Sequence, residues 1–359
     1  MIKLIDLYIL KRFVGRLAFL LIAISSIILI TNLVEMIDNF IDAEMNSNEI
    51  FYYYLYTLPM IISYALPMAI TIATVLSILT YIKNNELLAI RSLGINYFRL
   101  TKIIVILSVF ISMFHFYFEN TIVSNSNRLK NKIVRKYNLD KKNYKNNKNN
   151  FIEDINKNQS ILIMNYNNKN QTASKIVLKE INENNDVISR IDANKMEWVE
   201  NNWYFEELLY RTWNGNEEKF KSIKDTSIFL QNITPLYLTT EFIEPDQMNY
   251  FELKKFIETK KRNAGNTNKW AVGLHHKLSY SLSSLILTIT AIILSIALKN
   301  SNVSYGIGLS LLIITLYYVM LIIGKNLGIE GTLSPILSAW LANISLLLVM
   351  IYSYKRYVF

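Results

Sequence analysis

Six stretches of this 359-residue sequence are long and apolar enough to cross a membrane as helices. A helix needs about 20 mainly apolar residues to span the hydrocarbon core of a bilayer. The stretches are Phe13–Val34, Phe51–Ile82, Ile103–Val123, Leu278–Leu298, Tyr305–Ile323 and Pro335–Tyr352. Mean hydropathy is +0.21 and 52% of the residues are hydrophobic, which excludes an ordinary soluble enzyme. The sequence therefore predicts a membrane α-helical protein with six transmembrane helices.

The Lys and Arg residues of the short loops predict its orientation. Such residues concentrate in cytoplasmic loops, and alternate loops here carry eleven of them on one side against Lys325 alone on the other. The loop Glu35–Glu49, which follows the first span, has five acids and no Lys or Arg. The basic N-terminus resembles a signal peptide but leads into a full-length span without a cleavage pattern. We expect a multi-pass membrane protein with both termini in the cytoplasm.

A long polar insert separates the third and fourth spans and, by this topology, lies in the periplasm. After a helical exit and an Asn/Lys-rich tract, its hydrophobic pattern changes to period two, which is typical of strands. The expected strands are 160–165, 175–181, 187–199, 203–212, 218–223 and 227–231, separated by Asn-rich turns. Several short antiparallel strands at this spacing predict an inserted all-β domain of sandwich or jellyroll-like form.

These patterns divide the chain into four regions. We expect spans 1–3 over 1–123 with a cytoplasmic loop at 84–100, a β-jellyroll-like domain over 124–245, a periplasmic connecting helix over 246–276, and spans 4–6 over 277–359. Pro59 and Pro67 lie inside the second span, where each removes a backbone donor, so that helix is expected to be bent or interrupted.

Motifs for catalysis or cofactor binding are absent from the sequence. Gly324-Lys325 lacks a phosphate-binding loop before it, and Gly306 and Gly308 are better explained by helix packing. The adjacent His275 and His276 point to different helix faces and lack a third metal ligand. The net charge of +10 is dispersed among acids and amides, which argues against nucleic acid as a partner. We expect no catalytic, cofactor-binding or metal site, and no enzyme activity in this chain.

The loop Asn84–Leu100 carries the most informative polar residues. One interpretation of Glu86 and Arg91 is a solvated connection between helices. The functional alternative is a coupling helix that inserts into a groove of a cytoplasmic ATPase, where Glu86 pairs with a basic residue and Leu87, Leu88 and Ile90 provide an apolar anchor.

A family resemblance favours the second interpretation. The sequence from Asn85 to Ile95, NELLAIRSLGI, resembles the segment between the second and third spans of the LptF/LptG (YjgP/YjgQ) permeases, which export lipopolysaccharide. Phe251-Glu252-Leu253 and the segment Leu274–Leu278 resemble the family's approach to its fourth span, and the order of three spans, a β domain and three spans also agrees. The Lys277 position and the N-terminal pattern look more like the LptG branch.

The resemblance implies a non-catalytic permease subunit in a bacterial inner membrane, part of an ATP-driven exporter that extracts lipopolysaccharide and passes it to a periplasmic bridge. Its implied partners are an LptB-like ATPase dimer, an LptF-like second permease, and LptC-like and LptA-like bridge proteins. The implied coupling residues are Glu86, Leu87, Leu88, Ile90, Arg91 and Gly94.

Two departures from the family bear on this comparison. Val123 and Ser281 stand where relatives often have prolines, and Glu35 and Asp38 stand where some relatives have basic residues that meet lipid phosphates. The candidate phosphate contacts in this chain are therefore Lys277 and Lys325; the alternatives are contacts from the partner subunit or a less anionic substrate. Two rival functions stay open: an ATP-driven permease for another lipid or a lipoprotein, and a membrane tether that holds a β domain without transport.

Overall fold

A computed structural model describes residues 4–86, 92, 97–137, 139, 151–156, 159–167, 170–182, 186–199, 202–214, 217–228, 235, 244–262, 266–297 and 302–357. The chain divides into two compact units. The first contains residues 1–137, 245–250 and 268–359, and the second contains residues 138–244 and 251–267.

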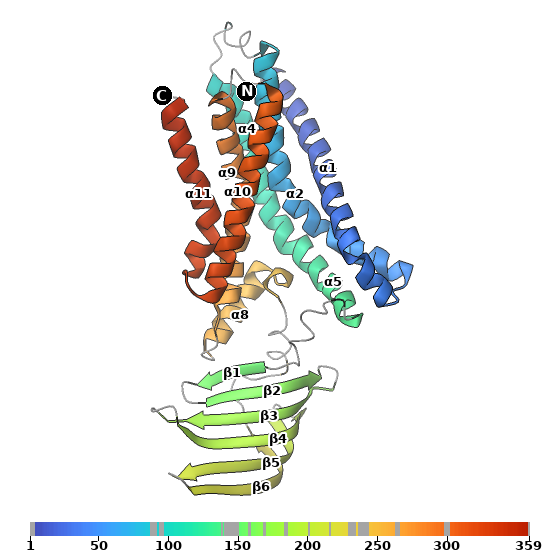
Figure 1. Cartoon of the computed structure of the whole chain (residues 1–359), viewed down its shortest axis with the longest axis vertical. Coiled ribbons are helices and arrows are strands. Elements are labelled where there is room, and N and C mark those ends of the chain that lie inside the picture. The colour runs from blue at the N-terminus through green and yellow to red at the C-terminus, as the bar shows by residue number, and fades with distance from the viewer. Residues whose placement is uncertain are drawn as a thin grey trace. The chain divides into compact units, whose positions relative to one another are not determined.

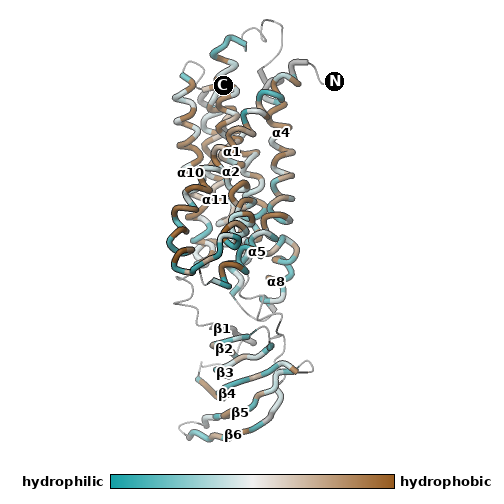
Figure 2. The backbone as a smooth tube through the Cα atoms, turned by 90° about the vertical axis from the view of Figure 1, so that its right-hand side faces the viewer, coloured by the Kyte–Doolittle hydropathy of each residue, from teal (hydrophilic) through white to brown (hydrophobic). Residues whose placement is uncertain are grey.

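The first unit is a helical bundle in which six helices are long and apolar enough to cross a membrane (Figure 1). Its helices and helical turns are α1 Leu4–Asp42, α2 Ser47–Lys83, α4 Tyr97–Phe118, η1 Glu119–Val123, α5 Ser124–Lys136, η2 Pro245–Gln247, α9 Asn268–Ala297, α10 Val303–Glu330 and α11 Pro335–Tyr357. Figure 2 shows hydrophobic residues along most of the length of these helices. The six predicted spans are confirmed, and each coincides with a helix of the bundle; Leu298, the last residue of the fourth predicted span, lies outside the described residues.

Helices α2 and α9 form the centre of the bundle. Of the most apolar 18-residue stretch of each helix, 72% is buried in α2 and 56% in α9, against 6% in α1. Ala69, Ala73 and Ala291 are fully buried, and such small side chains allow close helix packing. The apolar side chains of α1 instead remain largely exposed, so this helix presents its hydrophobic surface to lipid or to another chain.

The two prolines do not interrupt α2, which continues through Pro59 and Pro67 to Lys83. The third span is also longer than expected: α4, η1 and α5 follow one another without a break as far as Lys136. Val123, at a position where relatives often have proline, is buried and ends the π-helical turn η1. Such turns insert an extra residue into a helix and occur often at functional sites.

The second unit contains one six-stranded antiparallel sheet, so the inserted β domain is confirmed. Its strands are β1 Phe151–Asn156, β2 Gln159–Asn167, β3 Thr172–Ile181, β4 Val187–Val199, β5 Asn202–Asn214 and β6 Glu217–Ile228. Each described strand pairs with its sequence neighbours, which makes the connections those of a meander. The sequence missed β1, and the separate strands expected at 218–223 and 227–231 are one strand as far as Ile228; residues 229–231 lie outside the described part.

At one level of the sheet, the alternation between buried and exposed residues shifts by one position along the strands. Buried positions advance by three residues instead of two, from Ala173 to Ile176 in β3 and from Phe205 to Leu208 in β5. The pairs of these residues in β4, Met196 and Ala193, show the same step. Lys175 has a φ of 55°, in the left-handed region that side chains other than glycine rarely adopt. The strict alternation expected from the sequence therefore holds only on either side of this level.

The connecting helix is shorter than predicted. It consists of the turn η2 and, after a break, of α8 Tyr250–Arg262. Leu253, Phe256 and Ile257 form a buried stripe on α8, whereas Phe251 is 78% exposed. The 100° step between helix neighbours separates Phe251 from that stripe.

Candidate functional site

The loop after α2 is described only in part. Glu86 lies within the described residues, whereas Leu87, Leu88, Ile90, Arg91 and Gly94 lie outside them. α2 ends at Lys83, and Asn85 then adopts a φ of 57°, which Asn tolerates better than most residues. This turn directs the chain away from the helix axis and positions Glu86 beside the first helix.

Glu86 is surrounded by hydrogen-bond donors from its own chain. Arg12 Nη1 lies 2.9 Å from Glu86 Oε1 and 3.2 Å from Oε2. Tyr8 Oη donates to Oε2 and Asn84 Nδ2 donates to Oε1, each over 3.2 Å. The Arg12 guanidinium also lies over the Tyr8 ring, 4.9 Å from its centroid. Sequence reasoning missed Tyr8 and Arg12 because 78 and 74 residues separate them from Glu86.

These contacts keep the Glu86 carboxylate charged. Partial burial raises the pKa of Glu86, but hydrogen bonds from Asn84 and Arg12, the Arg12 charge and the Tyr8 hydrogen bond outweigh that effect. The resulting pKa of Glu86 lies below its usual value of 4.5. The carboxylate can therefore form one charged contact with α1, or exchange that contact for a cation of another protein.

A second polar cluster lies inside the bundle and joins α2, α4, η1 and α9. Ser63 Oγ lies 2.6 Å from Glu119 Oε2 and 2.9 Å from His115 Nε2. A hydroxyl has one proton, so when Ser63 donates to the carboxylate, His115 Nε2 donates to Ser63. Tyr280 Oη donates to the Ser63 carbonyl over 3.2 Å, and its ring contacts that of His115.

This cluster has the residues of a hydrolytic triad without its geometry. The carboxylate bonds the hydroxyl and not the imidazole, and His115 is fully buried. Its chemistry is limited to holding helices together and, through the chain His115–Ser63–Glu119, to sharing protons between them. His276 is also part of this region, because its ring stacks on Tyr280 at 5.3 Å. Among the described residues, no group of three His, Asp or Glu side chains is arranged to hold a metal ion.

At the same end of the bundle, the segment that returns from the insert is fixed to η1 and α5. Ser124 Oγ donates to the Met248 carbonyl over 3.2 Å, and the Tyr250 amide donates to Asn120 Oδ1 over 3.0 Å. Asn127 Nδ2 lies 3.4 Å from the carbonyl and from the carboxylate of Asp246. The chain thus leaves and re-enters the bundle through one hydrogen-bonded joint.

The two candidate phosphate contacts have different surroundings. Lys277 is 4% exposed and its Nζ lies 3.3 Å from Ser124 Oγ, within the joint. Lys325 is exposed on α10. Of these two lysines, only Lys325 is accessible to a lipid phosphate from the surface of the isolated chain.

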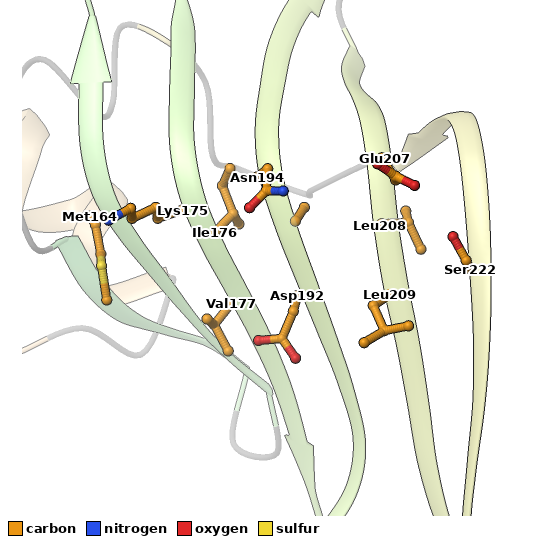
Figure 3. Close-up of a pocket in the computed structure, with 11 residues that line it drawn as sticks. Met164, Lys175, Ile176, Val177, Asp192, Asn194, Glu207, Leu208, Leu209 and Ser222 are labelled. Carbon is orange, nitrogen blue, oxygen red and sulfur yellow. The ribbon is translucent and has the colours of Figure 1, made fainter.

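An open hollow of about 460 Å³ lies on the sheet (Figure 3). The cross-strand neighbours Val177, Asp192 and Leu209 lie side by side there, and Lys175, Asn194 and Glu207 line the hollow at the level where burial changes phase. The lining of this hollow is partly polar and partly apolar, which suits contact with an amphiphilic surface. The hollow is too open to enclose a small molecule.

Comparison with known proteins identifies a relationship over nearly the whole chain. The profile of one family, lipopolysaccharide export system permease LptF/LptG, matches residues 7–356. A search of curated proteins finds no match.

Proposed function

Because the chain belongs to the LptF/LptG family of lipopolysaccharide export permeases, we propose that it is the subunit that couples ATP hydrolysis in a separate protein to extraction of lipopolysaccharide. The six apolar helices and the family make it a multi-pass inner membrane protein. The loop after α2 would face the cytoplasm with both termini, and the β unit would face the periplasm. The loop charges support this orientation.

The observation that carries the coupling proposal is the environment of Glu86. Its side chain is only 25% exposed, is held by three donors and immediately precedes the family-like segment Leu87–Gly94. A carboxylate held in this way is pre-organised for a charged contact with an LptB-like ATPase dimer, with the apolar residues that follow as anchor.

Movement at the loop would reach the other side of the membrane through α2. This helix is the most buried span, and Ser63 connects its opposite half to Glu119 and His115 on the third span. The third span continues into α5, to which the returning segment 245–250 is bonded. We infer that α2, the Ser63 cluster and this joint transmit force toward the β unit, which would pass lipopolysaccharide to LptC-like and LptA-like bridge proteins. An LptF-like permease would complete the transport cavity, with Lys325 as a contact for lipid phosphate.

Exchange of the charges at positions 12 and 86 distinguishes the contact of Glu86 with α1 from its proposed contact with the ATPase. Glu86→Lys should abolish export and weaken copurification of the ATPase, and the double variant Arg12→Glu/Glu86→Arg should stay defective although it restores the pair within the chain. Glu49→Ala is the matched control, because it removes a 2.6 Å ion pair with Lys136 elsewhere in the chain.

Either of two results would contradict the coupling role. Export that survives Glu86→Lys would remove Glu86 from the mechanism, and full rescue by the double variant would limit Glu86 to the contact with α1. Normal lipopolysaccharide export on depletion of the chain would instead indicate a tether, and a different lipid in the purified complex would indicate another cargo.

A further inference from the structure

The first turns of α1 carry a cationic hollow that shares Tyr8 and Arg12 with the Glu86 contact and adds Lys11 and Arg16, which that contact does not use. Its volume is about 610 Å³ and its lining comes from Tyr8, Lys11, Arg12, Gly15, Arg16 and Phe19. These residues contribute three positive charges and no negative charge. We propose that this hollow binds the headgroup of an anionic phospholipid.

Two of the three cations of the hollow have no ion-pair partner in the described part of the chain. Arg12 is paired with Glu86, but no described residue forms an ion pair with Lys11 or Arg16. Arg16 Nη1 is buried, and no described residue accepts a hydrogen bond from it. The Arg16 guanidinium is held 5.8 Å from the centroid of the Tyr81 ring. A buried donor without an acceptor is unfavourable, and a small rotation toward phosphate oxygens would remove that penalty.

Charge asymmetry across the membrane explains basic residues at this end of α1, but not the space between them. A Cβ added to Gly15 would meet no atom within 4 Å, so packing of the described residues gives no reason for glycine there. Glycine is less favourable than alanine inside a helix. The missing side chain instead leaves room between Lys11 and Phe19, one helical turn before and one turn after it.

The position of the hollow identifies a lipid as the source of the phosphate. Arg16 is the last charged residue before the uncharged stretch Leu17–Val34, so the hollow lies at the level of the headgroups. Phe19 and Ile22 continue the same face and are 72% and 69% exposed, which provides an apolar track for an acyl chain. Basic pockets at this level of a membrane bind anionic headgroups such as phosphatidylglycerol and cardiolipin.

Binding of phosphatidylglycerol to the purified full-length chain in phosphatidylcholine nanodiscs tests the proposal. Lys11→Gln/Arg16→Gln should weaken binding roughly 25-fold, because each charge in direct contact with the bound headgroup contributes about fivefold. Gly15→Leu keeps every charge but fills the hollow, and should weaken binding to a similar extent. Lys83→Gln/Lys355→Gln removes the same charge from exposed positions outside the hollow and should change binding less than about twofold.

Four results would overturn the proposal. Equal losses in the two double variants would indicate diffuse attraction to the surface, and unchanged binding in Gly15→Leu would exclude the hollow as the site. If inorganic phosphate alone binds to the chain and Lys11→Gln/Arg16→Gln removes that binding, the ligand is free phosphate. If a photoreactive group at position 15 cross-links to a partner permease and not to lipid, the hollow is a helix contact.

Discussion

The side chains of Glu86 and Ser63 each contact several charged or polar groups, most of which are distant in sequence. Glu86 receives donors from α1 and from the end of α2, and Ser63 contacts a histidine, a carboxylate and, through its carbonyl, a tyrosine. In both clusters, removal of one member leaves the others without their partners. A substitution in either cluster should therefore change the charge or the hydrogen bonding of the groups that remain.

The pKa of Glu86 should depend on Arg12. Because the folded pKa lies below 4.5, the contact between Glu86 and α1 should be fully present above pH 4.5 and should be lost as the pH falls through the lower, folded value. Arg12→Gln should raise the pKa of Glu86 toward its usual range. Carboxyl-carbon NMR of the full chain, labelled at glutamate and assigned with Glu86→Gln, measures both values; an unchanged pKa in Arg12→Gln would contradict the importance of this pair.

Ser63→Ala should destabilise the helical bundle by about 1–3 kcal/mol, because it leaves Glu119 and His115 without their shared hydroxyl. Thermal unfolding of the purified chain in detergent measures the effect. Ser26→Ala is the matched control, since Ser26 is exposed on α1 and its one hydrogen bond to a described residue is to the carbonyl of Ile22 in the same helix. Equal melting temperatures of the two variants would show that the Ser63 cluster does not hold the spans together.

Among the helices, α10 shows how glycines determine which elements touch. A Cβ added to Gly324 would collide with the backbone oxygen of Ser338 in α11, whereas one added to Gly308 would meet nothing within 4 Å. Of the two glycines interpreted from the sequence as packing residues, Gly306 is confirmed, because a Cβ there would collide with the Leu79 side chain of α2, and Gly308 is not. Backbone cannot move aside as a flexible side chain can, so the close approach of α10 to the Ser338 carbonyl of α11 requires glycine at position 324.

Gly324→Ala should therefore lower the stability of the bundle by about 1–3 kcal/mol through overpacking. Gly308→Ala should be neutral or should stabilise the helix by up to about 1 kcal/mol, because alanine favours helices and the space is open. Urea or thermal unfolding in one detergent compares the two variants. Similar stability losses in both would mean that the tight approach at Ser338 has no energetic effect.

At the level of the whole protein, the two units have different environments if the proposed topology holds. The chain contains no cysteine, so a single introduced cysteine reports its own position. Glu197 on β4 and Lys83 at the end of α2 are both exposed. They provide one reporter for each side of the membrane.

In cells with a permeabilised outer membrane, a membrane-impermeant maleimide should label Glu197→Cys. It should label Lys83→Cys only after the inner membrane is disrupted. Ser63→Cys serves as the unlabelled control, because Ser63 is buried in the bundle. Labelling of Lys83→Cys in intact inner membranes would reverse the orientation and would contradict the cytoplasmic location of the coupling loop.

The sequence by itself determined the features that depend on local composition. Spans follow from runs of apolar residues that must satisfy their backbone groups as helices, and most strands follow from alternation. The resemblance at Asn85–Ile95 correctly identified the family. Local patterns missed β1, which follows the Asn/Lys-rich tract, and overestimated the effect of Pro59 and Pro67, because a helix packed at the centre of a bundle tolerates them.

Only the tertiary structure decided which distant side chains meet. It paired Glu86 with Arg12, buried Lys277 beside Ser124, and brought Ser63, His115 and Glu119 together. It also determined the level at which the alternation of buried and exposed residues shifts in β3, β4 and β5, because this shift depends on the backbone of Lys175 and on the pairing of residues between strands. Hydropathy depends on each residue's own chemistry, whereas hydrogen bonds and ion pairs act over a few ångströms and require the fold that brings their groups together.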